Sequence, residues 1–217
     1  MQAQDTTCTS DLLSRDFGLC EYQSTWDKMR DYTLTRSENS IDQIWYLQHS
    51  PVYTLGLNGK RKHVLQTNHI PLIPTDRGGQ VTYHGPGQLI AYLLIDMPRK
   101  KIGIKHIVNA IEQAVIDYLK SLNIHSERLA GAPGIYVEDA KIAALGLRVR
   151  NGCTYHGLAL NVDMDLLPFN SINPCGYEGM QVTQIKDLIA SPPDMDAVKT
   201  GLHRHLCQHL GYNSNVK

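Results

Sequence analysis

The sequence has 217 residues and no excess of either charge sign. Lys and Arg together number 21, as do Asp and Glu, so the formal net charge is zero. Proteins that bind nucleic acid usually carry a basic stripe, and none is present, so we expect no nucleic-acid partner. A small basic cluster at residues 60–63 is typical of a solvated loop, although a positive rim would also suit an acidic protein partner.

Long apolar runs are also missing. The longest apolar stretches fall far short of the roughly 20 residues that span a membrane, and the first ten residues show no basic-then-apolar signal pattern. We therefore predict a soluble, cytoplasmic protein with no membrane partner. The length is sufficient to bury a sizeable core, in one domain or in two small ones.

Cysteine is sparse and follows no pattern. The five cysteines are an odd number and none forms a Cys-x-x-Cys pair, so neither a disulfide framework nor a zinc site is predicted. Most should be small buried thiols, and one is available as a nucleophile. Among the ten histidines, only His203, His205 and His209 have ligand-like spacing, and they fall in an apparent surface helix, so we predict no metal.

The order of apolar and turn-forming residues predicts an α+β protein with a mixed, largely antiparallel sheet flanked by helices. The first ten residues are expected to be a loosely held end. Turns are expected at 131–134 and at Asn151-Gly152, and Thr183 is a candidate helix cap. We predict a single domain over residues 1–217, although 1–20 and 190–217 carry no diagnostic motif. The expected helices cover about 22–36, 104–122 and 195–210, and the expected strands 41–48, 51–56, 89–96, 135–137, 141–150 and 153–162.

The stretch from Arg77 to Gln88 is the most unusual segment of the chain. It packs four glycines into twelve residues and is followed at once by an apolar run typical of a buried strand. Glycine lets a backbone come close to a ligand, because there is no Cβ to clash. A long hairpin loop has a similar composition, so the segment alone leaves a binding site and a plain loop both open.

Two residues further along are candidates for chemistry. Cys175 lies between a proline and a glycine in a loop, where a thiol is accessible, and a nucleophilic thiol needs a neighbour that helps it to lose its proton. Lys141 opens an apolar strand, so its amine would project into a dry pocket, where desolvation favours the neutral form. His84 is the rival base, since Cys–His pairs are more usual. From the residues alone, the base stays open between Lys141 and His84.

Small residues also recur on the two strands of the predicted hairpin, in 144–146 and 157–159. Small residues that face each other leave room for a ligand such as an aliphatic chain, and a tight crossing of strands is the alternative. On the first interpretation the glycines form the pocket floor, and a larger side chain at Gly146 would shorten the pocket.

Together these segments resemble the lipoyl(octanoyl) transferases, enzymes that place octanoyl groups on lipoyl domains. The resemblance covers roughly residues 20–190, and four separated matches in the family's order are far more specific than one. It implies a fold shared with biotin and lipoate protein ligases. The matching blocks are 77–88 with Tyr92, 141–146, 154–162 and 173–176.

The resemblance implies a two-step acyl transfer that uses no ATP and no cofactor. Cys175 would accept the octanoyl group from octanoyl-acyl carrier protein as a thioester, and Lys141 would activate the thiol. A lysine of a lipoyl domain would then take the group as an amide. The implied acceptors are the lipoyl domains of 2-oxoacid dehydrogenase complexes and the glycine cleavage H protein, and we expect a monomer. The implied acyl pocket is lined by Arg77, Gly78, Gly79, Gln80, Val81, Thr82, Tyr83, His84, Ala144, Leu145, Gly146, Gly157, Leu158 and Ala159.

Two other functions compete with this one. An ATP-dependent lipoate or biotin protein ligase on the same fold would form an acyl-adenylate and would have no need of Cys175; the sequence has no Gly-Arg-Gly-Arg-type adenylate loop. A non-catalytic acyl-binding module would need neither Cys175 nor Lys141.

Overall fold

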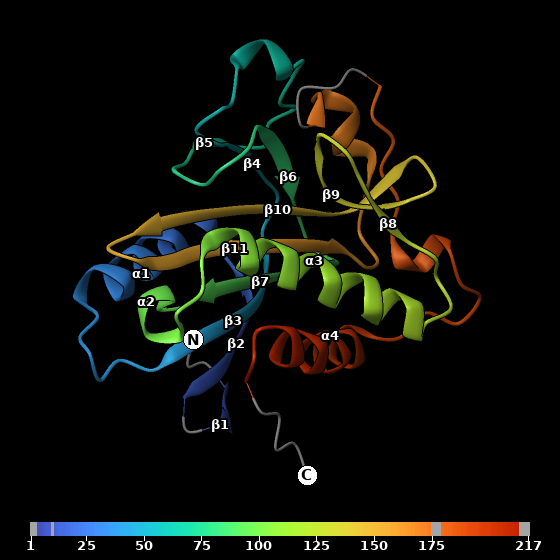
Figure 1. Ribbon diagram of the computed structural model, residues 1–217. Helices are drawn as coiled ribbons and strands as arrows, with labels where there is room; N and C mark the ends of the chain where they lie inside the picture. Colours follow the sequence, from blue (N-terminus) through green and yellow to red (C-terminus); the bar gives the residue numbers. More distant parts are fainter. Residues whose placement is uncertain (1–3, 10, 175–178, 213–217) are drawn as a thin grey trace.

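A mixed sheet of eight strands forms the centre of the fold (Figure 1). The computed structural model describes residues 4–9, 11–174 and 179–212. The strand order is β1-β2-β3-β7-β11-β10-β9-β8, and neighbours are antiparallel except for the parallel pair β2 and β3. The strands are β1 (Gln4–Thr9), β2 (Leu12–Cys20), β3 (Asp42–His49), β7 (Gln88–Leu94), β8 (Glu127–Leu129), β9 (Ala132–Val137), β10 (Ala140–Arg150) and β11 (Cys153–Asn161).

Helix α1 (Tyr22–Thr35) covers one face of this sheet. It connects β2 to β3, which are parallel, and parallel neighbours require a crossover because a tight hairpin reverses the chain direction. The fully buried Met29 packs among Trp45, Ile90 and Tyr92 on the sheet. The N-terminal turn of α1 is thereby brought next to the centre of the sheet.

Helices α3 (Ile104–Ser121) and α4 (Met195–His209) lie side by side on the opposite face (Figure 1). The apolar stripe of α3 predicted from its spacing is buried there, Ile107, Ile111 and Val115 included. The side chain of Asp194 caps α4 by accepting a hydrogen bond from the backbone N–H of Ala197 at 2.8 Å, and Gly211 follows its end with φ +70°.

A smaller sheet, in the order β5-β4-β6, stands against one end of the larger one. Strand β6 is part of the glycine-rich stretch, and it pairs antiparallel with β4, whereas β5 is parallel to β4. Its strands are β4 (Val52–Leu55), β5 (Leu72–Pro74) and β6 (Val81–His84). Further short elements are helix α2 (Met97–Lys100) and the 3₁₀ turns η1 (Arg61–His63), η2 (Leu167–Ser171) and η4 (Ile185–Asp187).

Three expectations about local structure were wrong. Residues 4–9 are not a loose end, because they form β1, which pairs with β2. The expected turn at 131–134 is shifted, since Pro133 and Gly134 lie within β9. Thr183 caps no helix, because the element after it is the 3₁₀ turn η4, whose N-cap is Gln184. The glycine-rich segment, for which a plain loop had stayed open, contains β6 at its centre. For β1 and β9, pairing with the neighbouring strand overrides the local pattern.

The hairpin of β10 and β11 is confirmed, with Asn151 and Gly152 both at positive φ, as a two-residue hairpin turn requires. Within it Gly157 lies so close to β7 that a Cβ atom on it would be only 2.0 Å from the carbonyl oxygen of Ala91. The close approach of the two strands therefore requires a glycine at this position, and Gly157 also lines the pocket described below.

Replacing Gly157 with alanine should destabilise the protein by about 2 kcal/mol or more, because β7 and β11 must separate to admit the methyl group. Urea denaturation of the variant measures this. Gly103→Ala is the matched control, since a Cβ there meets nothing within 4 Å. Equal stabilities of the two variants would contradict the close approach.

Candidate active site

A pocket lies between the larger sheet, the start of α1 and the glycine-rich segment. It holds about 770 Å³ of empty space, its open mouth included. Its floor is formed by β7, β10 and β11, whose register places residues in three rows. From one end these rows are Gln88 and Asn161; Ile90, Ala144 and Ala159; Tyr92, Gly146 and Gly157.

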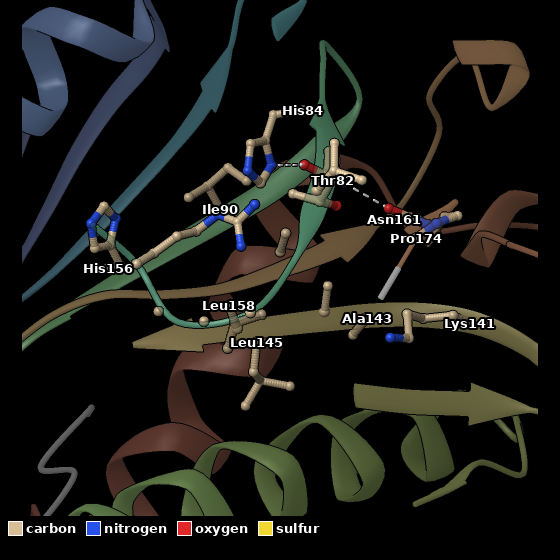
Figure 2. A pocket seen from close by; sticks show the side chains of 18 of the residues that line it. Thr82, His84, Ile90, Lys141, Ala143, Leu145, His156, Leu158, Asn161 and Pro174 are labelled. Atoms are coloured by element: carbon tan, nitrogen blue, oxygen red, sulfur yellow. Dashed lines mark hydrogen bonds between the residues drawn. The ribbon is translucent and has the colours of Figure 1, made fainter. Parts of the chain in front are cut away.

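The amine of Lys141 is at one end of the pocket. Figure 2 shows Lys141 at this end and His156 at the other, with Ile90, Leu145 and Leu158 between them. Lys141 is only 4% exposed, and its Nζ donates a hydrogen bond to the Pro133 carbonyl at 2.9 Å. The ring of Tyr136 lies 5.1 Å from the same atom. Lys141 is therefore buried and lines the pocket, as expected of its position at the start of the strand.

The segment after Asp76 forms a wall at the opposite end. Gly78 donates its backbone N–H to the carbonyl of Leu147 on β10 at 3.0 Å. A Cβ on Gly146 would be 2.8 Å from the Gly78 carbonyl oxygen, so the glycine is needed where the loop rests on the strand. Gly146 therefore has two roles: it lies in the pocket floor, and it supports the backbone of the loop.

The guanidinium of Arg77 holds this loop in shape. Its Nη2 donates to the carbonyls of Thr54 and Gln80, both at 2.7 Å, and its Nη1 donates to the Gly78 carbonyl at 2.9 Å. The Nε donates to the Thr54 hydroxyl at 3.1 Å. Arg77 lines the pocket, but these donors are directed to the protein's own backbone and to Thr54.

Two buried histidines beside the pocket have fixed tautomers. His84 Nδ1 donates to Gln88 Oε1 at 2.7 Å, and Gln88 in turn donates to Asn161 Oδ1 at 2.9 Å. His49 Nδ1 donates to the Cys20 carbonyl at 3.1 Å, so its Nε2 accepts from the Tyr92 hydroxyl at 2.7 Å. Burial lowers the pKa of His49 to about 4 and the pKa of His84 well below 6.5, so both rings are neutral at pH 7.

His156 is in an unusual conformation. Its φ is +58°, within strand β11, and its ring stacks on that of Tyr155 at 5.0 Å. Neighbouring side chains in a regular strand point to opposite faces, so the positive φ is what places both rings on one face. His156 Nε2 donates to Asp76 Oδ1 at 2.9 Å, and its buried Nδ1 has no hydrogen-bond partner among the described residues.

The carboxylate of Asp76, just before the glycine-rich segment, accepts hydrogen bonds from three side chains. Trp26 Nε1 donates at 2.9 Å, and His156 and the Tyr155 hydroxyl donate as well. Burial raises the pKa of Asp76, but these hydrogen bonds outweigh it and bring the pKa to about 2. Burial also lowers the pKa of His156, against the opposing effect of Asp76.

Most residues of the predicted acyl pocket come together here. Arg77, the residues 79–82, His84, 144–146 and 157–159 all line the pocket, as does Lys141. Gly78 and Tyr83 do not: Gly78 faces β10, and Tyr83 packs in the core of the small sheet. Cys175 lies outside the described residues, although Pro174, directly before it, lines the pocket. Sequence reasoning missed these lining residues: Tyr22, Gln88, Ile90, Tyr92, Ala143, His156, Asn161, Phe169, Pro174 and Val182.

The histidines of α4 are held apart by separate partners. His203 Nδ1 bonds the Tyr46 hydroxyl at 2.9 Å, and His209 Nε2 bonds Asp117 at 2.7 Å. Across the described part of the chain, no group of three or more His, Cys, Asp or Glu side chains could hold a metal ion. No helix there is long and apolar enough to cross a membrane.

Comparison with known proteins identifies the family. The profile described as lipoyl protein ligase A/B catalytic domain matches residues 22–207. The octanoyltransferase of Thiobacillus denitrificans is 57% identical over 177 residues, which are 82% of this chain and 81% of that protein. The octanoyltransferase of Nitrosococcus oceani is 50% identical over 200 residues, or 92% of this chain and 89% of that protein. This chain belongs to the lipoyl(octanoyl) transferase family. It is an acyltransferase.

Solved structures confirm the fold predicted from the resemblance. A lipoate-protein ligase A bound with ATP superposes with a TM-score of 0.71, over 92% of this chain and 85% of that one, at 17% identity. The biotin protein ligase of Aquifex aeolicus, in complex with biotin and ATP, gives 0.60 over 95% and 73%, at 12% identity. The structural similarity shows that this chain has the fold of the biotin and lipoate protein ligases.

Lowering the pH from 7 to 5 should reduce the free energy of unfolding. His49 has its pKa lowered from 6.5 to about 4 in the folded state, so the unfolded chain binds its proton first. The stabilisation from neutral His49 is complete above pH 6.5 and is lost as the pH falls toward 4. About 2 kcal/mol of it is lost by pH 5. The ionised carboxylate of Asp76 also stabilises the fold, but this stabilisation is lost at lower pH, between 3.8 and about 2.

Urea denaturation of the wild type and of His49→Gln at both pH values measures this effect. The variant should lose less stability than the wild type between pH 7 and 5. An equal loss in both proteins would show that His49 is not the titrating group.

Proposed function

We propose that this chain transfers an octanoyl group from octanoyl-acyl carrier protein to a lysine of a lipoyl domain, through a thioester on Cys175. One observation carries the proposal: the buried amine of Lys141 lines the same pocket as Pro174, the residue before Cys175. The naming of relatives that are 50–57% identical as octanoyltransferases supports the acyl group.

The pocket has the length for an eight-carbon chain. Rows on its floor are two residues apart along a strand, or about 6.6 Å, so the first and third rows are roughly 13 Å apart. Seven C–C bonds of about 1.5 Å reach no further than roughly 10.5 Å. With its carbonyl at the Lys141 end, the acyl chain would therefore run over Ala144 and Ala159 and end just short of the glycine row.

In the first step, the amine of Lys141 takes the proton of the Cys175 thiol, and the thiolate attacks the carbonyl carbon of the acyl donor. The new C–S bond forms as the bond to the carrier's sulfur breaks, and the departing thiolate takes the proton back from Lys141. In the second step, the acceptor lysine's amine attacks the Cys175 thioester. An amide forms, and Lys141 moves the amine proton to the leaving Cys175 thiolate.

The lowered pKa of His84 argues against this histidine as the base. A histidine whose pKa lies well below 6.5 is a weak acceptor for a thiol proton, since the ordinary pKa of cysteine is about 8.5. His84 would instead place the substrate, through its bond to Gln88 on the polar row. Exchange of one thioester for another is nearly balanced, and amide formation is downhill, so the transfer needs no ATP.

The wider setting of the reaction is part of the same proposal. Residues 1–217 act as one catalytic unit, a cytoplasmic monomer. The acceptors are the lipoyl domains of the 2-oxoacid dehydrogenase complexes and the glycine cleavage H protein. Lipoyl-domain proteins as substrates fit both the octanoyltransferase relatives and the ligases that share the fold.

Intact-protein mass spectrometry after mixing with octanoyl-acyl carrier protein, without ATP, tests the proposal. We expect a single octanoyl increment that maps to Cys175 and is discharged by an apo lipoyl domain. Cys175→Ser should show no stable thioester increment. Octanoylation of the lipoyl domain only when ATP and free octanoate are supplied would make the chain a ligase.

Lys141→Ala should lower the single-turnover rate of acylation by about 100-fold or more, because a positioned base typically contributes that much. His84→Ala should act mainly on substrate binding, with a smaller loss of rate at saturation. Lys186→Ala is the control for loss of a lysine, since Lys186 is exposed and pairs with Asp163. Equal rate losses for Lys141→Ala and His84→Ala, with binding intact, would contradict the assignment of the base.

A further inference from the structure

We propose that residues 76–80 form the end wall that limits the length of the acyl chain, and that Asp76 is the positioning residue that anchors this wall. The inference rests on the proposed function, since it places the acyl carbonyl at the Lys141 end. Figure 2 shows the glycine-rich segment passing across the pocket between His156 and Thr82, on the side away from Lys141.

The wall is braced from two sides by backbone contacts. On one side, Gly78 rests on Gly146 and bonds Leu147 of β10. On the other side, the turn after β4 bonds the same loop: Leu57 N–H donates to the Arg77 carbonyl at 3.0 Å, and Asn58 N–H donates to the Gly79 carbonyl at 3.1 Å. A loop held between two strands in this way cannot withdraw freely when a longer chain presses on it.

Asp76 fixes the point where the wall begins. Its carboxylate is bonded by Trp26 of α1 and by Tyr155 and His156 of β11, so one side chain ties the loop to two elements of the large-sheet layer. The positive φ of His156 is the strained feature that brings its ring to the carboxylate. Backbone strain of this kind persists where the surroundings hold it, and it gathers at functional sites.

The position of the wall matches the length of the substrate. The loop rests on Gly146 in the third row, roughly 13 Å from the first row. An eight-carbon chain that starts near the first row reaches at most roughly 10.5 Å and ends just short of the loop, whereas the nine C–C bonds of a ten-carbon chain reach up to roughly 13.5 Å and meet it. Tyr92 of the same row and His156 carry polar atoms, so they offer no apolar space to further methylenes. A ten-carbon chain would therefore have to displace the loop.

Removing the anchor should relax the length limit. We expect Asp76→Ala to raise the ratio of decanoyl to octanoyl transfer by roughly tenfold, the gain available from burying two more methylenes. Acyl-carrier-protein thioesters of six, eight, ten and twelve carbons are the donors, and an apo lipoyl domain is the acceptor. Asp76→Asn, which keeps an acceptor oxygen, should shift the ratio in the same direction but less.

Asp117→Ala is the matched control, because Asp117 also pairs with a histidine and is similarly exposed, but lies on α3. Its length profile should equal that of the wild type. An unchanged profile in Asp76→Ala and Asp76→Asn, or an equal fall for all lengths, would overturn the inference.

Calorimetric binding of free octanoic and decanoic acid to the same variants separates the two proposals, because it needs no turnover. Tighter decanoate binding by Asp76→Ala supports the wall even if transfer fails. An unchanged preference for octanoate overturns the wall even if the wild type transfers octanoyl groups. Absence of transfer in the wild type would count against the proposed function only.

Discussion

The contact between Gly78 and Gly146 is the constraint on which the pocket depends. A loop can close over a sheet only if its backbone polar groups find partners, and here the Gly78 N–H bonds the Leu147 carbonyl. The approach is so close that a single Cβ on Gly146 would be 2.8 Å from the loop's carbonyl oxygen. The two glycine-containing motifs, far apart in sequence, are thus two halves of one contact.

Burial of polar groups around the pocket follows from the same closure. Arg77 directs its donors to backbone carbonyls and Thr54, and Asp76 accepts from three side chains, so neither leaves an uncompensated charge beside an acyl chain. His49 and His84 are neutral because burial disfavours their charged forms. The apolar character of the cavity therefore comes as much from satisfied polar groups as from Ile90 or Leu158.

Sequence patterns predicted the helices at 22–36 and 104–122 well, because in each of them residues at helical spacing face the sheet, and the apolar stripe of α3 is strong. They also predicted the β10–β11 hairpin, since Asn-Gly favours the positive φ values that such a turn needs. The same patterns did not predict the short strands β1, β6 and β8. These strands form because they pair with other strands, and local composition does not specify the partners. Pocket residues such as Tyr22 and Tyr92 were absent from the predicted site because they look like ordinary core aromatics.

The chemistry of the site was readable in the chain itself, because a lysine that opens an apolar strand and glycines crowded before a buried strand are unusual locally. The resemblance to the family suggested that these residues belong to one site. The shape of that site could not be predicted from the sequence. Only the register of β7, β11 and β10 places small residues in rows, and only the folded loop shows why Gly146 must be glycine. The φ of His156 and the three donors on Asp76 arise from contacts between residues up to 80 positions apart, and no local pattern encodes such contacts.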